Sequence, residues 1–330
     1  MILFFTTMVF GTLLAISSYS WFSMWIGLEI NLLSIIPLFS NVKSIYPSEA
    51  ALKYFITQAM ASSILLFSVI LLLTMNEFLP MNSILLTTLN SSLLTKMGAA
   101  PFHFWFPEVI EGLNWMNSLI LLTWQKLAPL VILSYNTQLV LFISIVIIIS
   151  AMVGGILGLN QLSLRKILAF SSINHLGWML ASIMISSPIW FNYFLVYSVI
   201  SLNLILIFNH LNLFVLHQAS SALKNSKLTK ISVILNFLSL GGLPPLLGFF
   251  PKWMTLNILT ENNFNFLGIL MVILTLITLF FYLRICFSSL TLNNYEKIIS
   301  SNETPPFSEL FINMASLAGL SIGPMILFML

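Results

Sequence analysis

The sequence predicts an all-α integral membrane protein, and two observations carry that prediction. Of its 330 residues, 59% are hydrophobic and only 6% are charged, whereas a soluble domain is about 25% charged. The apolar stretches run for about twenty residues without strand-like alternation, and this is the length that a helix needs to cross a hydrocarbon core of roughly 30 Å. A water-soluble fold could not bury so much apolar surface, and the pattern does not suit a β-barrel.

Apolar runs bounded by polar or turn-forming residues predict about eleven transmembrane helices. They cover residues 2–19, 21–40, 54–75, 82–107, 115–134, 137–159, 166–186, 189–216, 231–256, 266–288 and 309–329. The connections are short, so we expect no soluble domain between any two spans. The opening residues lack the basic segment and cleavage site of a secretory signal, so we expect the first run to be a permanent span.

The basic residues predict how these spans are oriented. When the connections are assigned alternately to two sides, nine of the twelve basic residues fall on the side of the N-terminus: Lys43, Lys53, Arg165, Lys166, Lys224, Lys227, Lys230, Arg284 and Lys297. Lys and Arg concentrate on the side from which a chain is not translocated. We therefore predict that the N-terminus lies on the positive side, which is the matrix or cytoplasmic side, and the C-terminus on the opposite side.

The charge and cysteine content exclude other classes of function. The net charge of +3 is too dispersed for a nucleic-acid interface. The single cysteine, Cys286, provides neither a disulfide framework nor a thiolate metal cluster. The basic cluster of Lys224, Lys227 and Lys230 is a candidate site for anionic lipid. We expect small residues such as those from Gly154 to Gly158 to support contacts with partner helices.

Four charged residues lie inside predicted spans: Glu29, Lys96, Lys126 and Lys252. A charge at the centre of a bilayer costs about 2.5–3.5 kcal/mol on insertion scales, so such residues normally face a polar interior and serve a transport pathway. Glu29 and Lys96 both lie well inside the membrane, so they can pair. Pairing would keep both groups charged, whereas apolar surroundings favour the neutral form of a lone lysine. The alternative is a static ion pair that only fixes helix packing.

Two spans contain residues that break helices beside these lysines. The fourth span has Gly98 and Pro101 after Lys96, and the ninth has Pro244 and Pro245 before Lys252. Proline removes a backbone donor, and carbonyls freed at membrane depth need water or polar partners. We therefore expect hydrated broken helices at the fourth and ninth spans.

These breaks occupy corresponding positions in spans 1–5 and spans 6–10, as expected for two inverted five-helix repeats. We place the repeats at about 1–136 and about 137–290, followed by a C-terminal helix at about 309–330, all within a single domain of residues 1–330. Lys126 is expected in an uninterrupted fifth span.

Two histidines are candidate proton relays, because the imidazole ring titrates near neutral pH. His103 follows Pro101 in the fourth span, and His175 lies in the polar segment of the seventh. The alternative for each is a buried histidine that is hydrogen-bonded for structural reasons only.

Four segments carry a resemblance to a known family. They are Trp25-Ile-Gly-Leu-Glu29-Ile-Asn31, Lys96-Met-Gly-Ala-Ala-Pro101-Phe-His-Phe-Trp-Phe-Pro107-Glu108, Trp124-Gln-Lys126-Leu-Ala-Pro129 and Gly242-Leu-Pro-Pro-Leu-Leu-Gly248-Phe-Phe-Pro-Lys252-Trp. Together they resemble the antiporter-like membrane subunits of respiratory complex I, in particular the chain 2 family of mitochondrial NADH:ubiquinone oxidoreductase. The resemblance covers essentially the whole chain and is closest to the shortened animal form, which lacks three spans.

The resemblance implies a core subunit of a proton-translocating NADH:ubiquinone reductase that performs no redox chemistry itself. It implies that Glu29 and Lys96 form a pair, that Lys126 is a bridging lysine and that Lys252 is the distal lysine. NADH, flavin, iron–sulfur clusters and ubiquinone would bind other subunits, and no cofactor is expected on this chain.

The implied location is the mitochondrial inner membrane, with the N-terminus on the matrix side and the C-terminus on the intermembrane-space side. The implied partners are neighbouring antiporter-like subunits, other membrane-arm and accessory subunits, and lipids such as cardiolipin. Two alternatives stay open: a subunit of a stand-alone cation/proton antiporter, and a purely structural membrane scaffold.

Overall fold

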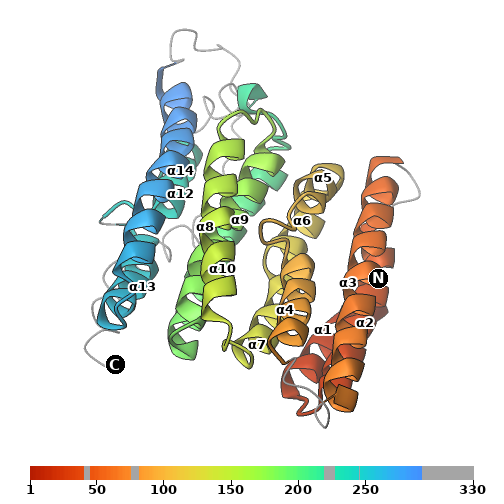
Figure 1. The fold of residues 1–330 in the computed structure, drawn as a ribbon. Helices are drawn as coiled ribbons and strands as arrows, with labels where there is room; N and C mark the ends of the chain where they lie inside the picture. The colour runs from red at the N-terminus through yellow and green to blue at the C-terminus, as the bar shows by residue number, and fades with distance from the viewer. Residues whose placement is uncertain (41–44, 76–81, 219–226, 245, 292–330) are drawn as a thin grey trace. The chain divides into compact units, whose positions relative to one another are not determined.

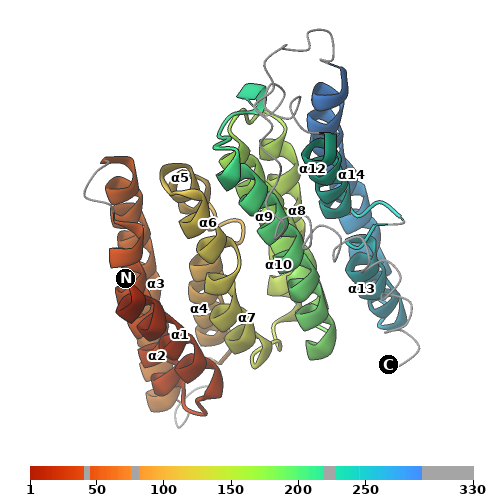
Figure 2. The same ribbon diagram turned by 180° about the vertical axis from the view of Figure 1, so that it is seen from behind.

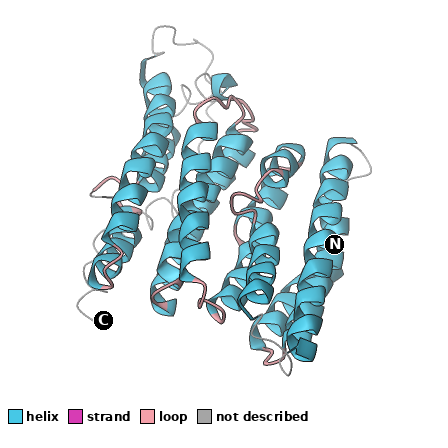
Figure 3. Cartoon of the chain, in the orientation of Figure 1, coloured by secondary structure: helices cyan, strands magenta, loops and turns pink. Residues whose placement is uncertain are grey.

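The computed structural model describes residues 1–40, 45–75, 82–218, 227–244 and 246–291. Every named element in this part of the chain is an α-helix (Figures 1 and 3). An isolated β-bridge joins Ser163 to Val215. The prediction of an all-α protein is confirmed. The chain divides into two compact units, Met1–Ser150 and Ala151–Leu330. The C-terminal helix predicted at 309–330 lies outside the described residues, as does Pro245.

The first unit is built from seven helices and the beginning of an eighth. They are α1 (Ile2–Ser17), α2 (Trp21–Phe39), α3 (Ile45–Met75), α4 (Asn82–Met97), α5 (Trp105–Gly112), α6 (Trp115–Leu122), α7 (Trp124–Ser134) and α8 (Val140–Gly158). Helix α3 packs against α2, α4 and α5, and α4 packs against α7. Helices α1 and α2 approach until their backbones touch, since a Cβ atom at Gly27 would lie 2.6 Å from the Ala15 nitrogen. Glycine permits this close contact.

The second unit is built around a central helix, α9 (Leu164–Ile183). All residues of α9 except Arg165 and Lys166 are buried. Around it lie the end of α8 and the helices α10 (Ser187–His210), α12 (Lys227–Gly241), α13 (Phe249–Glu261) and α14 (Asn265–Thr291). Helices α10, α13 and α14 all pack against α9, and Figure 2 shows α10 running alongside it.

The small residues of α8 pack helices of this chain together, and their contact with partner helices stays a prediction. A Cβ atom at Gly154 would lie 2.8 Å from the backbone of Asn174 on α9, and one at Gly158 would lie 2.9 Å from the Phe281 ring on α14. Both glycines are therefore used to pack helices within their own unit, because the absence of a side chain lets neighbouring helices approach closely.

Six helical segments of the described chain are long and apolar enough to cross a membrane, compared with about eleven predicted spans. They are Trp21–Phe39, Ile45–Thr74, Trp115–Ser134, Val140–Gly158, Ser187–His210 and Asn265–Phe287. Two shorter apolar helices, Ile2–Ser17 and Leu228–Gly241, accompany them. Large apolar side chains such as Phe67, Ile145 and Phe280 are exposed on their outer faces, as expected where lipid is the solvent.

Two helices end in the same kind of turn. Gly98 follows α4 with a φ of 75°, and Gly242 follows the last residue of α12 with a φ of 76°. After each glycine, the next amide donates to the carbonyl five positions earlier, at 3.1 Å and 3.3 Å. This is the Schellman motif, which favours glycine because a Cβ atom is disfavoured at positive φ. Helices α5 and α13 start only after the following turn.

The helix that carries Lys126 was expected to be uninterrupted, but it is divided at Thr123 into α6 and α7. The Thr123 hydroxyl donates to the carbonyl of Leu119 at 2.7 Å. The Lys126 amide then donates to the carbonyl of Thr123, only three positions back, at 3.2 Å. A threonine that bonds back to its own helix tends to bend it, and Pro129 lies further along inside α7.

Candidate functional site

Three lysines are buried, and they are the three that the sequence placed inside spans. The exposed fraction is 7% for Lys96, 1% for Lys126 and 7% for Lys252. Across the described residues, no other lysine or arginine side chain is in the buried class. Lys96 and Lys126 belong to the first unit and Lys252 to the second.

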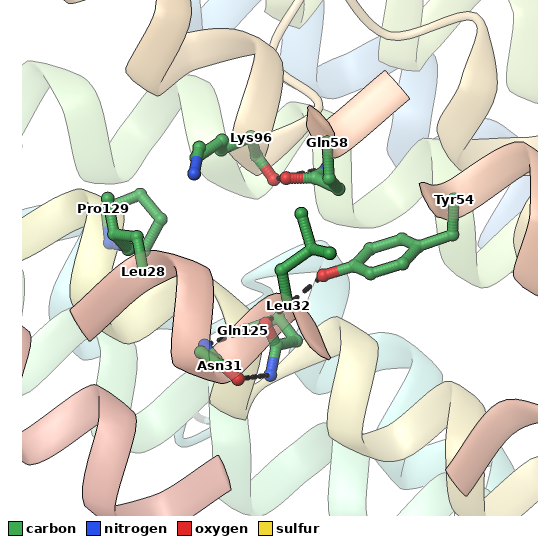
Figure 4. A pocket seen from close by; sticks show the side chains of 8 residues that line it. All are labelled: Leu28, Asn31, Leu32, Tyr54, Gln58, Lys96, Gln125 and Pro129. Atoms are coloured by element: carbon green, nitrogen blue, oxygen red, sulfur yellow. Dashed lines mark hydrogen bonds between the residues drawn. The ribbon is translucent and has the colours of Figure 1, made fainter. Parts of the chain in front are cut away.

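Lys96 lies in the last turn of α4 and lines a small cavity of about 10 Å³. This is close to the smallest volume that holds one water molecule. Figure 4 shows the residues that line the cavity, which come from α2, α3, α4 and α7: Leu28, Asn31, Leu32, Tyr54, Gln58, Lys96, Gln125 and Pro129. The amide of Gln58 donates to the backbone carbonyl of Lys96 at 3.4 Å. The cavity therefore offers a water molecule several polar neighbours beside a buried amine.

A hydrogen-bonded network of neutral side chains borders this cavity (Figure 4). The amides of Asn31 and Gln125 bond reciprocally, at 3.1 Å and 3.0 Å. The Tyr54 hydroxyl donates to the same oxygen of Gln125 at 3.3 Å. The network joins α2, α3 and α7, and Gln125 directly precedes Lys126 in the sequence. We did not predict these residues as part of the site. Asn31 and Gln125 do lie in the segments that carry the family resemblance.

Glu29 lies half-buried on α2 and forms no salt bridge with Lys96. Its carboxylate still attracts the Lys96 ammonium group electrostatically. The salt bridges found among the described residues join Lys53 to Glu49 and to Glu108, both at 3.1 Å. These three side chains are exposed. The pair of Lys53 and Glu108 joins α3 to α5 at the surface, whereas Lys53 and Glu49 both lie on α3.

Lys126 lies on α7, and its Nζ atom is 5.2 Å from the centroid of the Phe106 ring. An ammonium group over an aromatic face is attracted by the ring quadrupole. Phe106 lies on α5 and packs in turn against Gly98, where an added Cβ atom would lie 3.1 Å from the Phe106 side chain. The ring therefore connects the turn after α4 to the buried lysine on α7.

Lys252 lies near the start of α13 and reaches back to the end of α12. Its Nζ atom donates to the carbonyl of Leu240 at 3.1 Å and to that of Gly241 at 2.9 Å. These are among the last carbonyls of α12, where the helix dipole places partial negative charge. The Trp178 ring of α9 lies on the same ammonium group, with its centroid 5.9 Å away.

The two histidines lie in different surroundings. His103 is buried in the turn between α4 and α5, where its ring stacks on Phe104 with centroids 4.5 Å apart. His175 is buried on α9, and its Nδ1 atom lies 2.8 Å from the Tyr193 hydroxyl. A second ring, that of Tyr197, lies 5.1 Å from the His175 ring. This hydrogen bond gives the Nδ1 atom of His175 a structural partner, and the relay role of His175 stays a prediction.

The predicted helix-breaking prolines that the structure describes lie in the turns that follow the two glycines. Pro101 follows Gly98 and Pro244 follows Gly242, and both are exposed. These turns separate α4 from α5 and α12 from α13.

Comparison with known proteins identifies the family. The family model described as "NADH:quinone oxidoreductase/Mrp antiporter, TM" matches residues 18–278. NADH-ubiquinone oxidoreductase chain 2 of Anopheles gambiae is 49% identical over 332 residues, covering 98% of this chain and 97% of the mosquito chain. The chain belongs to the NADH-ubiquinone oxidoreductase chain 2 family. The resemblance inferred from its sequence segments is confirmed.

Two further relatives agree with this chain 2 assignment. Chain 2 of Aedes aegypti is 49% identical over 294 residues, covering 88% of this chain and 86% of the relative. A chain in the structure of respiratory complex I from Thermus thermophilus with bound aureothin superimposes with a TM-score of 0.85 at 23% identity. That match covers 96% of this chain and 76% of the bacterial chain, so the fold is that of a complex I chain.

Proposed function

We propose that this chain carries protons across the mitochondrial inner membrane along a line of four charged residues, the half-buried Glu29 and the buried Lys96, Lys126 and Lys252. As a chain 2 family member, it is a proton-translocating membrane-arm subunit of NADH:ubiquinone oxidoreductase and associates with other subunits of that complex. The observation that carries the proposal is the burial of three lysines inside a helical membrane protein. Placing a charged lysine within the membrane costs free energy, so such a residue normally serves an ion or proton pathway.

The surroundings of Lys96 support proton exchange at this residue. Its cavity is about the size of one water molecule and is bordered by amide groups and a hydroxyl. A water molecule held there could pass a proton to or from the amine. The half-buried carboxylate of Glu29 attracts the charged form of Lys96, so a change in this attraction would alter how readily Lys96 releases its proton.

In the proposed sequence of events, Lys96 passes a proton toward Lys126 and then Lys252 through ordered water, with His103 and His175 as candidate relays. Moving one elementary charge against the membrane potential takes about 2.3 kcal/mol per 100 mV. The making or breaking of one hydrogen bond to a charged group is worth about 1.5–3 kcal/mol. Small rearrangements around each lysine are therefore sufficient, and redox energy from cofactors on other subunits would drive them.

The two turns that begin at Gly98 and Gly242 support two inverted repeats with a broken helix in each. The pattern Gly-x-x-Pro-x-x-x-x-Phe-Pro occurs at residues 98–107 and again at residues 242–251. We place the repeats at about 1–136 and about 137–290, with the N-terminus on the matrix side and the C-terminus on the intermembrane-space side.

Further proposed partners are accessory subunits and anionic lipids such as cardiolipin. The basic cluster of Lys224, Lys227 and Lys230 would bind the lipid phosphates on the matrix side. We propose no cofactor on this chain.

The first experiment replaces Lys96 with alanine in the assembled enzyme. Proton pumping per NADH oxidised is measured in sealed vesicles, with equal assembly confirmed on a native gel. Lys53→Ala is the matched control, because it removes a lysine that lies at the surface. We expect Lys96→Ala to lower the ratio of protons to NADH and Lys53→Ala to leave it unchanged.

The same experiment separates the proposal from its two alternatives. An unchanged ratio in Lys96→Ala would mean that the buried lysine is structural. A scaffold role would appear as lost assembly, with normal pumping by the complexes that do form. A stand-alone cation/proton antiporter would pump without NADH and would respond to sodium.

A further inference from the structure

We infer that Gly242 is a positioning residue for Lys252: its missing side chain leaves the space through which Lys252 reaches the carbonyl groups at the end of α12. We call these two carbonyl groups, of Leu240 and Gly241, the α12 dock. The inference rests on the proposed function, because it concerns how the distal lysine is held while it carries a proton.

The dock is formed where two helices meet at a short turn. Helix α13 begins beside the end of α12, since Gly248 lies so close to Ser239 that a Cβ atom there would overlap the Ser239 carbonyl oxygen. Lys252 follows in the first turn of α13 and folds back toward the dock. Its ammonium group donates hydrogen bonds to the two carbonyl groups of the dock, at 3.1 Å and 2.9 Å.

Gly242 lies directly against the folded-back side chain of Lys252. A Cβ atom at Gly242 would lie 2.8 Å from Cδ, 3.0 Å from Nζ and 3.2 Å from Cε of Lys252. Carbon contacts this short do not persist in packed proteins, which keep non-bonded carbon atoms about 3.5–4.0 Å apart. A side chain at position 242 would therefore force Lys252 to shift from its docked position.

The dock suits a charged lysine better than a neutral one. Carbonyls at a helix C-terminus carry partial negative charge and attract a cation, and hydrogen bonds from an ionised donor are roughly twice as strong as neutral ones. The Trp178 ring adds a further contact that favours the ammonium form. The docked position therefore holds the proton-loaded lysine, and loss of the proton weakens its hold.

Glycine at position 242 has a second role, which the test must separate from the first. Its φ of 76° is unfavourable for other residues, so any substitution strains the turn even without touching Lys252. Gly98 shows that the turn does not need a lysine, because it has nearly the same φ and faces Phe106 instead. Backbone strain and the clash with Lys252 are therefore independent effects.

The experiment compares four assembled enzymes: wild type, Gly242→Ala, Lys252→Ala and the double variant. Gly268→Ala is the control for a glycine replacement, because its added Cβ atom would meet its nearest neighbour, Leu256, at an ordinary 3.5 Å. Proton pumping per NADH oxidised is measured in sealed vesicles at matched assembly. Gly242→Ala is expected to lower the ratio of protons pumped to NADH oxidised to the level of Lys252→Ala. The double variant is expected to have the same ratio as Lys252→Ala.

Each other outcome has a definite meaning. If Gly242→Ala pumps like Gly268→Ala while Lys252→Ala loses pumping, the dock is refuted and the proposed function stands. If Lys252→Ala itself pumps normally, the proposed function fails and the dock has no role in pumping.

Should Gly242→Ala fail to assemble, the double variant decides. Assembly that returns when Lys252 is truncated supports the clash, whereas assembly that stays lost shows that Gly242 serves the backbone alone.

Discussion

The amide network beside Lys96 gives a graded prediction about stability. Gln125 takes part in three hydrogen bonds, Asn31 in two and Tyr54 in one. Gln125→Met, Asn31→Leu and Tyr54→Phe remove these bonds while roughly keeping the volume of each side chain, so that cavity effects stay small. Each variant should therefore destabilise the packing of α2, α3 and α7 in proportion to the bonds it removes.

The expected magnitude follows from the number of bonds lost. At an average of about 0.6 kcal/mol for a hydrogen bond inside a helical membrane protein, the losses are about 1.8, 1.2 and 0.6 kcal/mol. The first two values rise if the partners left behind, Asn31 or Gln125, find no water, since an unsatisfied buried polar group costs about 1–3 kcal/mol.

A titration with sodium dodecyl sulfate measures this order. Purified complex is exposed to increasing detergent, and the fraction of the chain still bound to the complex is read from native gels. The Gln125→Met chain should leave the complex at the lowest detergent concentration, followed by the Asn31→Leu chain and then the Tyr54→Phe chain. If Tyr54→Phe is as unstable as Gln125→Met, the network does not act through Gln125, and the hydrogen-bond count is the wrong basis.

Three further predictions use the same native gels and vesicles. Phe106→Leu removes the ring face over Lys126 and should cost about 0.5–2 kcal/mol in cation–π attraction, and this part of the cost should vanish when Lys126 is already replaced by methionine. Gly27→Ala would place a Cβ atom 2.6 Å from the backbone of α1, so little assembled complex is expected on the gel. Tyr193→Phe removes the 2.8 Å contact with His175 and should cost about 0.6 kcal/mol; a large fall in pumping at unchanged stability would instead reveal a relay.

The charged part of the site was predictable because a charge in an apolar run is conspicuous. Lys96, Lys126 and Lys252 are the basic residues that no loop explains, and the structure buries all three. The turns beside Lys96 and Lys252 were also visible, since glycine and proline are strong helix breakers.

The neutral part of the site was not predictable in the same way. The hydrogen bond between Asn31 and Gln125 joins residues 94 positions apart. Nothing in the sequence indicates that these two amide side chains, each in an apolar span, face each other. The partners of Lys252 are backbone carbonyls, which any residue would supply. The division of the span at Thr123 is a local change of backbone geometry, which hydropathy does not report.

A related effect explains why fewer helices are apolar enough to cross a membrane by themselves than the sequence predicts, although α9 was predicted as the span 166–186. Hydropathy finds helices that face lipid, but a helix surrounded by protein can be more polar. Helix α9 has 20 residues and carries Asn174 and His175 in its interior, and it is not among the six segments that are apolar enough to cross a membrane by themselves.

The burial of α9 has a consequence for how the chain is made. Whether a newly made segment enters the bilayer depends on its own hydrophobicity. Helix α9 is less hydrophobic than the six segments that could cross a membrane by themselves. Its polar side chains find their partners on later helices: Asn174 bonds Thr278 of α14, and His175 bonds Tyr193 of α10. A nascent chain that stops after α9 lacks these partners, so we predict that α9 integrates stably only once the helices that follow it have been made.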